Sequence, residues 1–369
     1  MGESNCSKYS QKPIVPAVPW TPSMAGVACF STRAVHLRGN VLYLLRGSGW
    51  IRCKGSAASK QTAIDGEELY QRKTPIEHVL LRPGMYLGQM ESSEISTFVL
   101  EGEEGEKKVV KKVMRYSPAL LKIIDEILVN AADNRVRKGK MSYIRINASF
   151  SNGEMSLSVQ NDGASIPIKV HSTEKIHIPE MIFGNLLTGS NFDDTTASVV
   201  GGRHGYGAKL TNIFSKKFEV TISSAKKIYT QQWESNMSVI RPPKIQPFVP
   251  EDSSVKAGFT RVSFTPDLAR FQASSDLNME NMMQLIERRA FDLAACIGPS
   301  IQVYYNDVLI PIQSFKDFVN LFSHSLKNDV TNSSFYHEGN SNWQIGVMRF
   351  ENAEHMSFVN TLWTSRYTE

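Results

Sequence analysis

The stretch from Ser117 to about Lys138 constrains the fold most, because it reads as one long helix with two contrasting faces. Ser117 caps the free N–H groups at its start, and Pro118 fits the first helical position. At about 100° per residue, the apolar residues fall on one side, namely Leu120, Ile124, Ile127, Leu128 and Ala131. The polar residues fall on the other side, namely Glu126, Asn130, Asp133 and Asn134. A polar face of this kind meets solvent or carries chemistry.

A cluster of four glycines within seven residues opens a second expected helix, which continues to Ile213. The glycines, Gly201, Gly202, Gly205 and Gly207, let backbone N–H groups turn toward one point, and the helix start adds a positive dipole. Arg203 and Lys209 supply cations. The pattern GxxxxGK[ST] is absent, so this is not the common P-loop. We predict a phosphate-binding loop here, with an ordinary loop as the alternative.

Combined with the polar helix face, the glycine cluster points to nucleotide chemistry. Mg²⁺ on a triphosphate needs few protein ligands, because phosphates and waters fill most of its octahedron, so the carbonyl of Asn130 is sufficient. Glu126, one turn away, is placed to deprotonate a water that attacks the γ-phosphate. Asn161, at the end of an expected strand, can hydrogen-bond the edge of a base.

The remaining elements alternate between strands and helices. Two strands, Tyr143–Phe150 and Glu154–Asn161, are joined by a turn at 151–153. Helices are expected at Ile76–Leu81, Pro179–Leu187, Leu277–Ile297 and Ser314–Leu326, and Ile182, Phe183, Leu186 and Leu187 are expected to face inward. Further strands are expected at Met85–Gly88, Lys217–Ser223, Ile228–Trp233, Gly258–Phe264, Ile301–Tyr305, Val308–Ile312, Phe335–Glu338, Trp343–Arg349 and Ser357–Thr361. The acid-then-base run at 101–112 is expected to be a solvated hairpin loop.

Charge is distributed unevenly along the chain. The whole sequence carries +5, and residues 1–64 alone carry +7, so residues 65–369 carry −2 and predict no strong DNA-binding surface. The acid-poor segment 1–64 resembles a transit peptide, with a disordered extension as the alternative. No apolar run approaches the roughly 20 residues that cross a bilayer, so no membrane partner is expected.

Several strings resemble one family. DEILVNAADN, NDGxxIP, LLTxSN, GGRxGYGAKL with NIFS, and FTPDL are similar to the ATPase region of eukaryotic type II DNA topoisomerases, within the wider group of Bergerat-fold (GHKL) ATPases. The resemblance runs from about Glu67 to the end of the sequence. It implies an α+β fold, with a Bergerat-type α/β sandwich at 65–270 and an incomplete ribosomal-S5-like β-α-β transducer at 271–369, after a leader at 1–64.

The resemblance also implies roles for individual residues. Glu126 matches the general base, Asn130 the magnesium ligand, and Asn134 an amide on the ribose or phosphate side. Asn161 matches the adenine-recognition position, helped through water by Thr260. Positions expected to line the nucleotide are Ile166, Ile182 and Phe183 around the base, for which plain core is the alternative, and Gly189, Ser190 and Asn191 over the ribose. Lid positions are Gly202, Arg203, His204, Gly205, Tyr206, Gly207, Ala208 and the cation Lys209. Tyr70 resembles a strap residue that reaches the partner subunit, with a surface tyrosine as the alternative.

Three positions depart from the family pattern. Ser165 replaces a glycine, Gly189 replaces a serine, and His204 replaces an asparagine in the lid. None of these changes removes the expected base or metal ligand. At position 204, we expect a tolerated substitution whose backbone N–H still serves the lid.

The family resemblance supports one function with two open alternatives. We expect the ATP- and Mg²⁺-binding, ATP-hydrolysing part of a DNA topoisomerase (an isomerase), with DNA as a partner of the intact enzyme and a homodimer formed through the strap. The family's switch lysine and cleavage domain are not found in the sequence, so truncation and slow hydrolysis are expected. A non-catalytic ATP-binding dimerisation module is one alternative, and a chaperone or mismatch-repair relative is another. The expected location is the nucleus, with a mitochondrion or plastid as the alternative.

Overall fold

The computed structural model describes residues 41–46, 49–54, 70–102, 107–136, 140–189, 205–224, 226–248, 258–271, 277–325, 336–339, 344–347, 357–359 and 362–365. The chain divides into two compact units, Met1–Arg72 and Lys73–Glu369. In the first unit, β1 (Val41–Arg46) and β2 (Gly49–Lys54) pair as an antiparallel hairpin. The rest of the expected leader, 1–64, lies outside the described residues.

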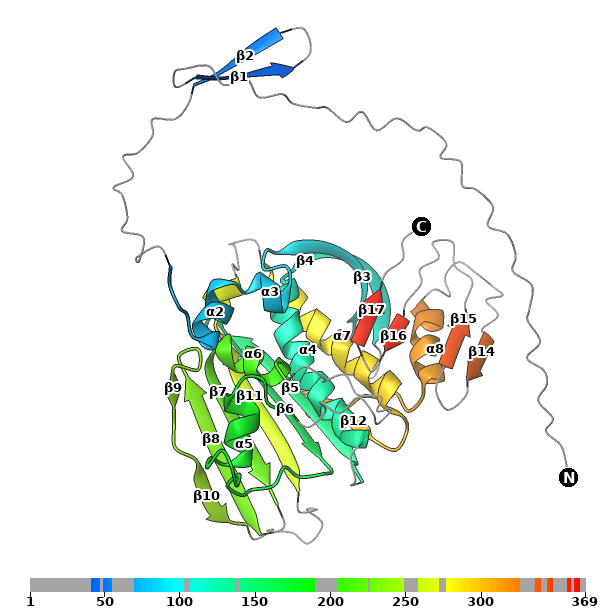
Figure 1. The fold of residues 1–369 in the computed structure, drawn as a ribbon. Helices are drawn as coiled ribbons and strands as arrows, with labels where there is room; N and C mark the ends of the chain where they lie inside the picture. The colour runs from blue at the N-terminus through cyan, green and yellow to red at the C-terminus, as the bar shows by residue number, and fades with distance from the viewer. Residues whose placement is uncertain are drawn as a thin grey trace, which may run out of the picture. The chain divides into compact units, whose positions relative to one another are not determined.

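The second unit is organised around one mixed β-sheet (Figure 1). Its described strands follow the spatial order β10-β8-β7-β11-β6-β5-β12-β13, and β9 pairs with β8. Neighbouring strands are antiparallel except β12, which runs parallel to β5. The strands are β5 (Tyr143–Ser151), β6 (Glu154–Asp162), β7 (Ser215–Ser223), β8 (Lys227–Glu234), β9 (Val239–Ile240), β10 (Lys244–Pro247), β11 (Phe259–Pro266), β12 (Gln302–Tyr305) and β13 (Val308–Leu309).

The hairpin of β5 and β6 follows directly from its sequence. Side chains alternate between exposed and buried along both strands, because successive residues of a strand point to opposite faces. The turn places Asn152 at φ 52° and Gly153 at φ 77°, the left-handed conformations that favour this residue pair in two-residue hairpins. The predicted strands and turn are confirmed.

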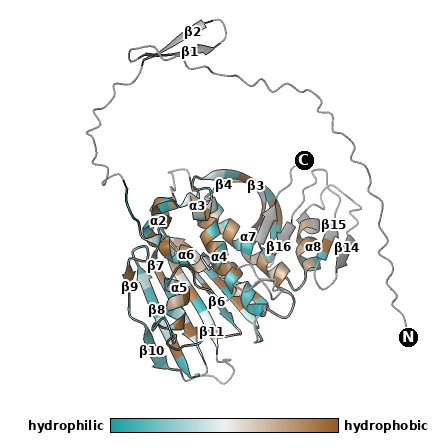
Figure 2. Cartoon of the chain, in the orientation of Figure 1, coloured by the Kyte–Doolittle hydropathy of each residue, from teal (hydrophilic) through white to brown (hydrophobic). Residues whose placement is uncertain are grey.

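Helices α4 (Pro118–Asp133), α5 (Ile178–Gly184), α6 (Gly207–Ile213) and α7 (Met279–Ile297) lie over the sheet (Figure 1). The apolar residues predicted for one face of α4 are buried in the main core, where they meet side chains from β6 and α7. Hydrophobic and hydrophilic residues alternate along α4 and α7, as expected for helices with one buried face (Figure 2). No helix among the described residues is long and apolar enough to cross a membrane.

Smaller elements surround this core. Two short helices, α2 (Pro75–Leu81) and α3 (Gly84–Leu87), precede the hairpin of β3 (Ser93–Glu101) and β4 (Lys108–Tyr116). The 3₁₀ turn η2 (Leu268–Phe271) comes before α7, and α8 (Phe315–Ser325) follows the sheet. Two strand pairs complete the described chain, namely β14 (Tyr336–Gly339) with β15 (Gln344–Val347), and β16 (Ser357–Val359) with β17 (Leu362–Ser365).

Two predictions near the start of this unit are wrong. The expected strand at Met85–Gly88 is helix α3, whose Leu87 is buried in the core, and an apolar run of this length fits either structure. The expectation of a solvated loop at 101–112 is wrong for 108–112, which belong to β4, while 103–106 lie outside the described residues. Val109 is buried, and two of the lysines contact α7. Lys107 pairs with Glu287 at 3.0 Å, and Lys112 Nζ donates to Gln284 Oε1 at 3.0 Å.

Two expected helices are shorter than predicted. The long helix ends at Asp133 and tightens into the 3₁₀ turn η1 (Asn134–Val136), while 137–139 lie outside the described residues. Helix α5 ends at Gly184, and Leu187 is 63% exposed at φ 61°, so the prediction that it faces inward is wrong. Strands β1, β2, β3, β4, β9, β10 and β17 were not predicted. The predicted division at residue 271 stays a prediction.

Candidate functional site

Helix α4 presents a polar face because its ends and its opposite face are fixed. The hydroxyl of Ser117 accepts a hydrogen bond from the Leu120 N–H at 3.3 Å, which is the cap that the sequence predicts. The apolar face is buried in the core, so Glu126, Asn130 and Asn134 are turned toward a cavity of about 690 Å³. The predicted polar face therefore lines a concave site.

The cavity brings together residues that are far apart in the sequence. Of the residues predicted for the site, those that line it are Glu126, Asn130, Asn134, Asn161, Ile166, Ile182, Phe183, Gly189, Gly205, Tyr206, Gly207, Ala208, Lys209 and Thr260. Tyr70 belongs to the first compact unit and is 83% exposed. Ser190, Asn191, Gly202, Arg203 and His204 lie outside the described residues.

The Glu126 carboxylate is held between its own helix and the start of α6. Lys122 Nζ lies 2.5 Å from Glu126 Oε1, one helical turn away. A Cβ added at Gly207 would lie 2.1 Å from Glu126 Oε2, a separation that real atoms do not reach. Position 207 therefore has room for glycine only while this carboxylate stays in place.

Two amides continue the polar face along α4. Asn130 is exposed in the cavity, where its side chain is open to solvent or a ligand. Asn134 is buried, and its Nδ2 donates to the Asp162 carbonyl oxygen at 3.2 Å. Its Oδ1 has no hydrogen-bond partner among the described residues. A buried carbonyl oxygen without a partner is costly, so it suits a ligand that donates a hydrogen bond.

The opposite wall is formed where the end of β6 lies beside the start of β11. Asn161 on β6 lies directly across from Thr260 on β11, as expected from their predicted joint role. The side chain of Asn161 is buried, and its Nδ2 donates to the Asp162 carbonyl oxygen at 2.8 Å. Thr260 and Asn161 thus offer adjacent polar groups at the cavity wall.

The neighbouring Asp162 has a structural role that the sequence did not reveal. Its Oδ1 accepts hydrogen bonds from the backbone N–H groups of Ser142, at 2.7 Å, and Tyr143, at 3.0 Å, and its Oδ2 accepts one from the Ser142 hydroxyl. These bonds hold the Asp162 carboxylate against Ser142 and Tyr143, so that of the two neighbouring residues Asn161 is the one that lines the cavity.

The turn after β6 accommodates the unusual Ser165. Gly163 adopts φ 108°, and a Cβ there would lie 3.2 Å from Met141 Cβ and 3.3 Å from Asn134 Nδ2, so this turn requires glycine. The Ser165 hydroxyl donates to the Ser223 carbonyl oxygen at 2.8 Å. The serine therefore points its hydroxyl toward β7, where it forms a bond that a glycine would not.

Lys209 is the cation of the α6 wall. It is only 4% exposed, and burial lowers the pKa of its ammonium to about 8. Its Nζ donates to the Thr188 carbonyl oxygen at 2.5 Å. A buried lysine that meets a carbonyl rather than a carboxylate gains from an anionic ligand.

Sequence reasoning missed several side chains that also line the cavity, among them Met85, Tyr86, Lys122 and Asp125. The Tyr86 ring lies 5.9 Å from the Tyr206 ring, and its hydroxyl lies 2.9 Å from Nδ1 of His78. The wrong strand prediction for 85–88 hid Tyr86. Lys122 could have been found from the sequence, because it lies four residues before Glu126 on the same helix.

Comparisons with known proteins give the site a context. Residues 116–270 match the family described as histidine kinase-, DNA gyrase B-, and HSP90-like ATPase. The chain is similar to DNA topoisomerase 2 top-2 of Caenorhabditis elegans, with 39% identity over 317 residues, which are 85% of this chain and 20% of that protein. It is also similar to the mitochondrial DNA topoisomerase 2 of Dictyostelium discoideum, with 38% identity over 351 residues, covering 83% of this chain and 27% of that protein.

Among solved structures, the ATPase region of Saccharomyces cerevisiae topoisomerase II matches the fold with a TM-score of 0.71 and 37% identity, over 80% of this chain and 75% of that one. The curated relatives are much longer, since the chain spans only 20% and 27% of the two described above. The similarity therefore concerns the ATPase region of those proteins.

Proposed function

The chain belongs to the type II DNA topoisomerase family, and we propose that it binds and hydrolyses ATP as the ATPase part of such an enzyme. One observation carries this proposal. A carboxylate, two amides and a buried lysine from α4 and α6 line the same cavity as Asn161 and Thr260 on the strand wall. A base, a charge-balancing cation and hydrogen-bonding groups for a nucleotide are thus gathered in one place.

Glu126 is the proposed general base of hydrolysis. Its carboxylate takes a proton from a water molecule as the water oxygen bonds to the γ-phosphorus, and the bond to the bridging oxygen breaks, releasing ADP. Lys209 balances the negative charge of the phosphates from the α6 side. The first turn of α6 brings backbone N–H groups to the same region.

The strand wall is proposed to read the base. Asn161 and Thr260 supply polar contacts to the adenine edge, while Ile166, Ile182 and Phe183 line the cavity with apolar surface for the ring. The Oδ1 of Asn134, which has no hydrogen-bond partner in the described part of the chain, is suited to accept a hydrogen bond from the ribose. Gly189 also lines the cavity and is the residue proposed to cover the sugar and phosphates.

The residues of α4 fit a magnesium ion that arrives with the nucleotide. No group of three or more His, Cys, Asp or Glu side chains forms a metal site among the described residues. Mg²⁺ on a triphosphate needs only one or two protein oxygens, and the amide of Asn130 is open to the cavity beside Glu126. When bound, the ion would neutralise charge on the phosphates. Asn130 is the proposed ligand.

The proposal for the whole enzyme follows from the family. We propose that ATP use is coupled to the passage of DNA strands, that two chains form a homodimer, and that Tyr70 reaches the partner's site. The proposed location is the nucleus. A mitochondrion is the alternative, because two similar proteins are named mitochondrial DNA topoisomerase 2 and residues 1–64 are poor in acid.

Turnover measurements test the proposed base. In Glu126→Gln, kcat should fall by about 10² to 10⁴, while binding of a non-hydrolysable ATP analogue is retained. The same change at Glu154, which is exposed and paired with Lys216, is the matched control and should leave kcat unchanged. A wild-type chain that binds the analogue without turnover would instead favour the non-catalytic dimerisation module.

A further inference from the structure

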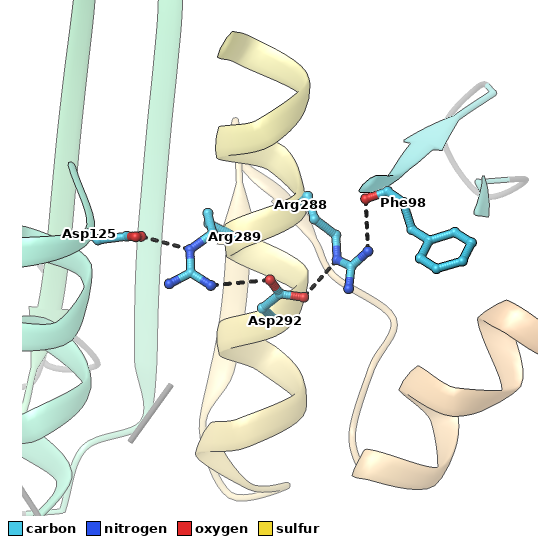
Figure 3. A network of polar contacts seen from close by, with 5 residues as sticks. All are labelled: Phe98, Asp125, Arg288, Arg289 and Asp292. Atoms are coloured by element: carbon cyan, nitrogen blue, oxygen red, sulfur yellow. Dashed lines mark hydrogen bonds and ion pairs between the residues drawn. The ribbon is translucent and has the colours of Figure 1, made fainter. Parts of the chain in front are cut away.

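A network of charged groups connects α4 to α7 (Figure 3), and its α4 member, Asp125, also lines the cavity. Arg289 Nε donates to Asp125 Oδ1 at 2.7 Å, and Arg289 Nη1 donates to Asp292 Oδ2 at 3.3 Å. Arg288 Nε donates to Asp292 Oδ1 at 2.7 Å, and Arg288 Nη1 donates to the Phe98 carbonyl oxygen at 2.9 Å. The network therefore runs from α4 through α7 to β3.

The four charged side chains are withdrawn from water. Their exposed fractions are 15% for Asp125, 7% for Arg289, 0% for Asp292 and 3% for Arg288. Burial raises the pKa of Asp125, and the Arg289 charge opposes that rise. Two carboxylates and two guanidinium groups balance one another. Such groups persist inside a protein only when their geometry is well satisfied, so the network holds α4 and α7 in one relative position.

Arg288 has a second set of contacts, with two aromatic rings. Its guanidinium lies 5.3 Å from the ring centroids of both Phe318 and Phe322 on α8. Arg288 thus joins α7 to β3 and α8, whereas Arg289 joins α7 to α4. Two adjacent residues of one helix consequently serve different neighbours, which gives a matched pair for experiments.

The position of Asp125 gives its ion pair a functional meaning. Asp125 directly precedes Glu126, and consecutive side chains on a helix point about 100° apart. Asp125 bonds Arg289 while Glu126 is held against Gly207 at the cavity. A rotation or slide of α4 that broke the Asp125 bond would also move the Glu126 carboxylate.

We propose that Arg289 is a positioning residue for hydrolysis, which sets the rotation of α4 through Asp125 and thereby places the Glu126 carboxylate. The inference rests on the proposed function, since it concerns the reaction that Glu126 is proposed to catalyse. Misplacement of a reacting group by about 1 Å can cost roughly 100-fold in rate, whereas binding is shared among many contacts. Loss of the Asp125–Arg289 pair should therefore affect kcat more than nucleotide affinity.

The charge-balanced double variant Asp125→Asn/Arg289→Gln, made in the full chain, tests this inference. It removes one charge of each sign and leaves the Arg288–Asp292 pair in place. We expect kcat and kcat/KM to fall together by roughly tenfold or more, the signature of lost transition-state stabilisation without lost binding. The Kd of a non-hydrolysable ATP analogue should stay close to that of the wild type. The single variant Arg289→Lys, which keeps the positive charge, should have a higher kcat than the double variant.

Arg288→Gln is the matched control, because it is equally buried on the same helix but does not contact Asp125 in the described network. It should lower the melting temperature and leave kcat of the folded protein unchanged. A double variant with wild-type kcat, or equal losses of kcat in the double variant and in Arg288→Gln, would overturn the positioning role. If the double variant does not fold, Asp125→Asn decides, since Arg289 then stays paired with Asp292.

The proposed function fails in a different way. Full activity in Glu126→Gln would refute the proposed base, whatever the Arg289 variants do. An inactive Glu126→Gln together with wild-type kcat in the double variant would refute the positioning role alone. A wild-type chain without turnover would overturn both.

Discussion

The cavity has a strand wall, formed by β6 and β11, and a helix wall, formed by α4, η1 and α6. The two walls differ in how many hydrogen bonds their polar groups make within the described chain. At the strand wall, Asp162 accepts three hydrogen bonds from Ser142 and Tyr143, and these bonds hold the end of β6 in place. Asn161 on the same strand end is paired through the ladder with β11. The groups that face the cavity here are therefore carried by a rigid support.

At the helix wall, the polar groups have partners that a ligand can replace. Glu126 is paired with the half-exposed Lys122, Lys209 meets only a carbonyl oxygen in the described contacts, and Asn134 Oδ1 has no described partner. In the proposed function, base recognition and hydrolysis therefore depend on walls of different construction. At the strand wall, hydrogen bonds within the protein fix the shape of the cavity. At the helix wall, Lys209 and Asn134 keep hydrogen-bonding capacity for a substrate.

The largest effect on the helix wall is expected where the start of α6 contacts Glu126. Gly207→Ala places a methyl group where the carboxylate lies, so Glu126 must move and kcat should fall by about 100-fold. Steady-state ATP turnover measures the loss. Gly84→Ala is the control, because a Cβ there meets nothing within 4 Å and position 84 also begins a helix. Wild-type turnover in Gly207→Ala would show that this wall is more adaptable than the structure indicates.

The strand wall should instead respond with a loss of stability. Asp162→Asn removes the charge that three donors share and turns part of the side chain into a donor, so the free energy of unfolding should fall by about 2 kcal/mol. Urea denaturation measures this change. Asp307→Asn, at an exposed residue 3.9 Å from Arg145, should change it by less than about 0.5 kcal/mol. Equal effects at the two positions would remove the distinction between the walls.

The next expected effect is a pH dependence of nucleotide binding at Lys209. With a pKa of about 8 in the free protein, Lys209 loses its proton as pH rises, and a bound triphosphate favours the protonated form. Affinity for an ATP analogue should therefore weaken by up to about fivefold between pH 8 and 9, with proton uptake on binding. Calorimetry in buffers of different ionisation enthalpy measures that uptake.

Stability of the nucleotide-free protein should change in the opposite direction. Because the folded pKa of Lys209 lies below its unfolded value, the unfolded state binds more protons between about pH 8 and 10.5, and this group adds stability as pH rises through that window.

Lys209→Arg should flatten the pH dependence of affinity. An unchanged slope in that variant would assign the titration to another group.

The smallest effect is expected at Lys122. Its pair with Glu126 joins two partly exposed side chains one helical turn apart, so Lys122→Gln should change the free energy of unfolding by only about 0.3 to 0.5 kcal/mol. Urea denaturation measures this value as well. A loss as large as that expected for Asp162→Asn would show that the helix wall is as firmly satisfied as the strand wall.

Local patterns predicted the parts of the fold that local chemistry determines. The Ser117 cap, the burial of one face of α4 and the turn at Asn152 and Gly153 follow from residues that are neighbours in the sequence. The boundary errors have local causes too. The long helix stops at Asp133 because the next turn tightens, and the N–H of Asn134 bonds to the carbonyls of Ala131 and Ala132.

Contacts between distant segments were not predictable in this way. Nothing around Met85 indicates that Tyr86 reaches the ring of Tyr206, and nothing around Arg289 indicates that it bonds Asp125 on another helix. The candidate site was predictable because long strings of the sequence match a known family. The charge network was not, since it depends on how α4 and α7 pack.

The parallel pairing of β12 with β5 limits where the molecule can bend. Residues 302–305 are in register with 143–146, and Asn306 extends this seam, because its N–H bonds to the Ile146 carbonyl oxygen and its Oδ1 accepts from the Ala148 N–H. A rigid-body rotation about residue 271 would break the hydrogen bonds between β12 and β5. The chain leaves the sheet only after Leu309. We therefore expect any movement of the later segments relative to the cavity to have its hinge beyond β13, with β12 remaining attached to the sheet that carries Asn161.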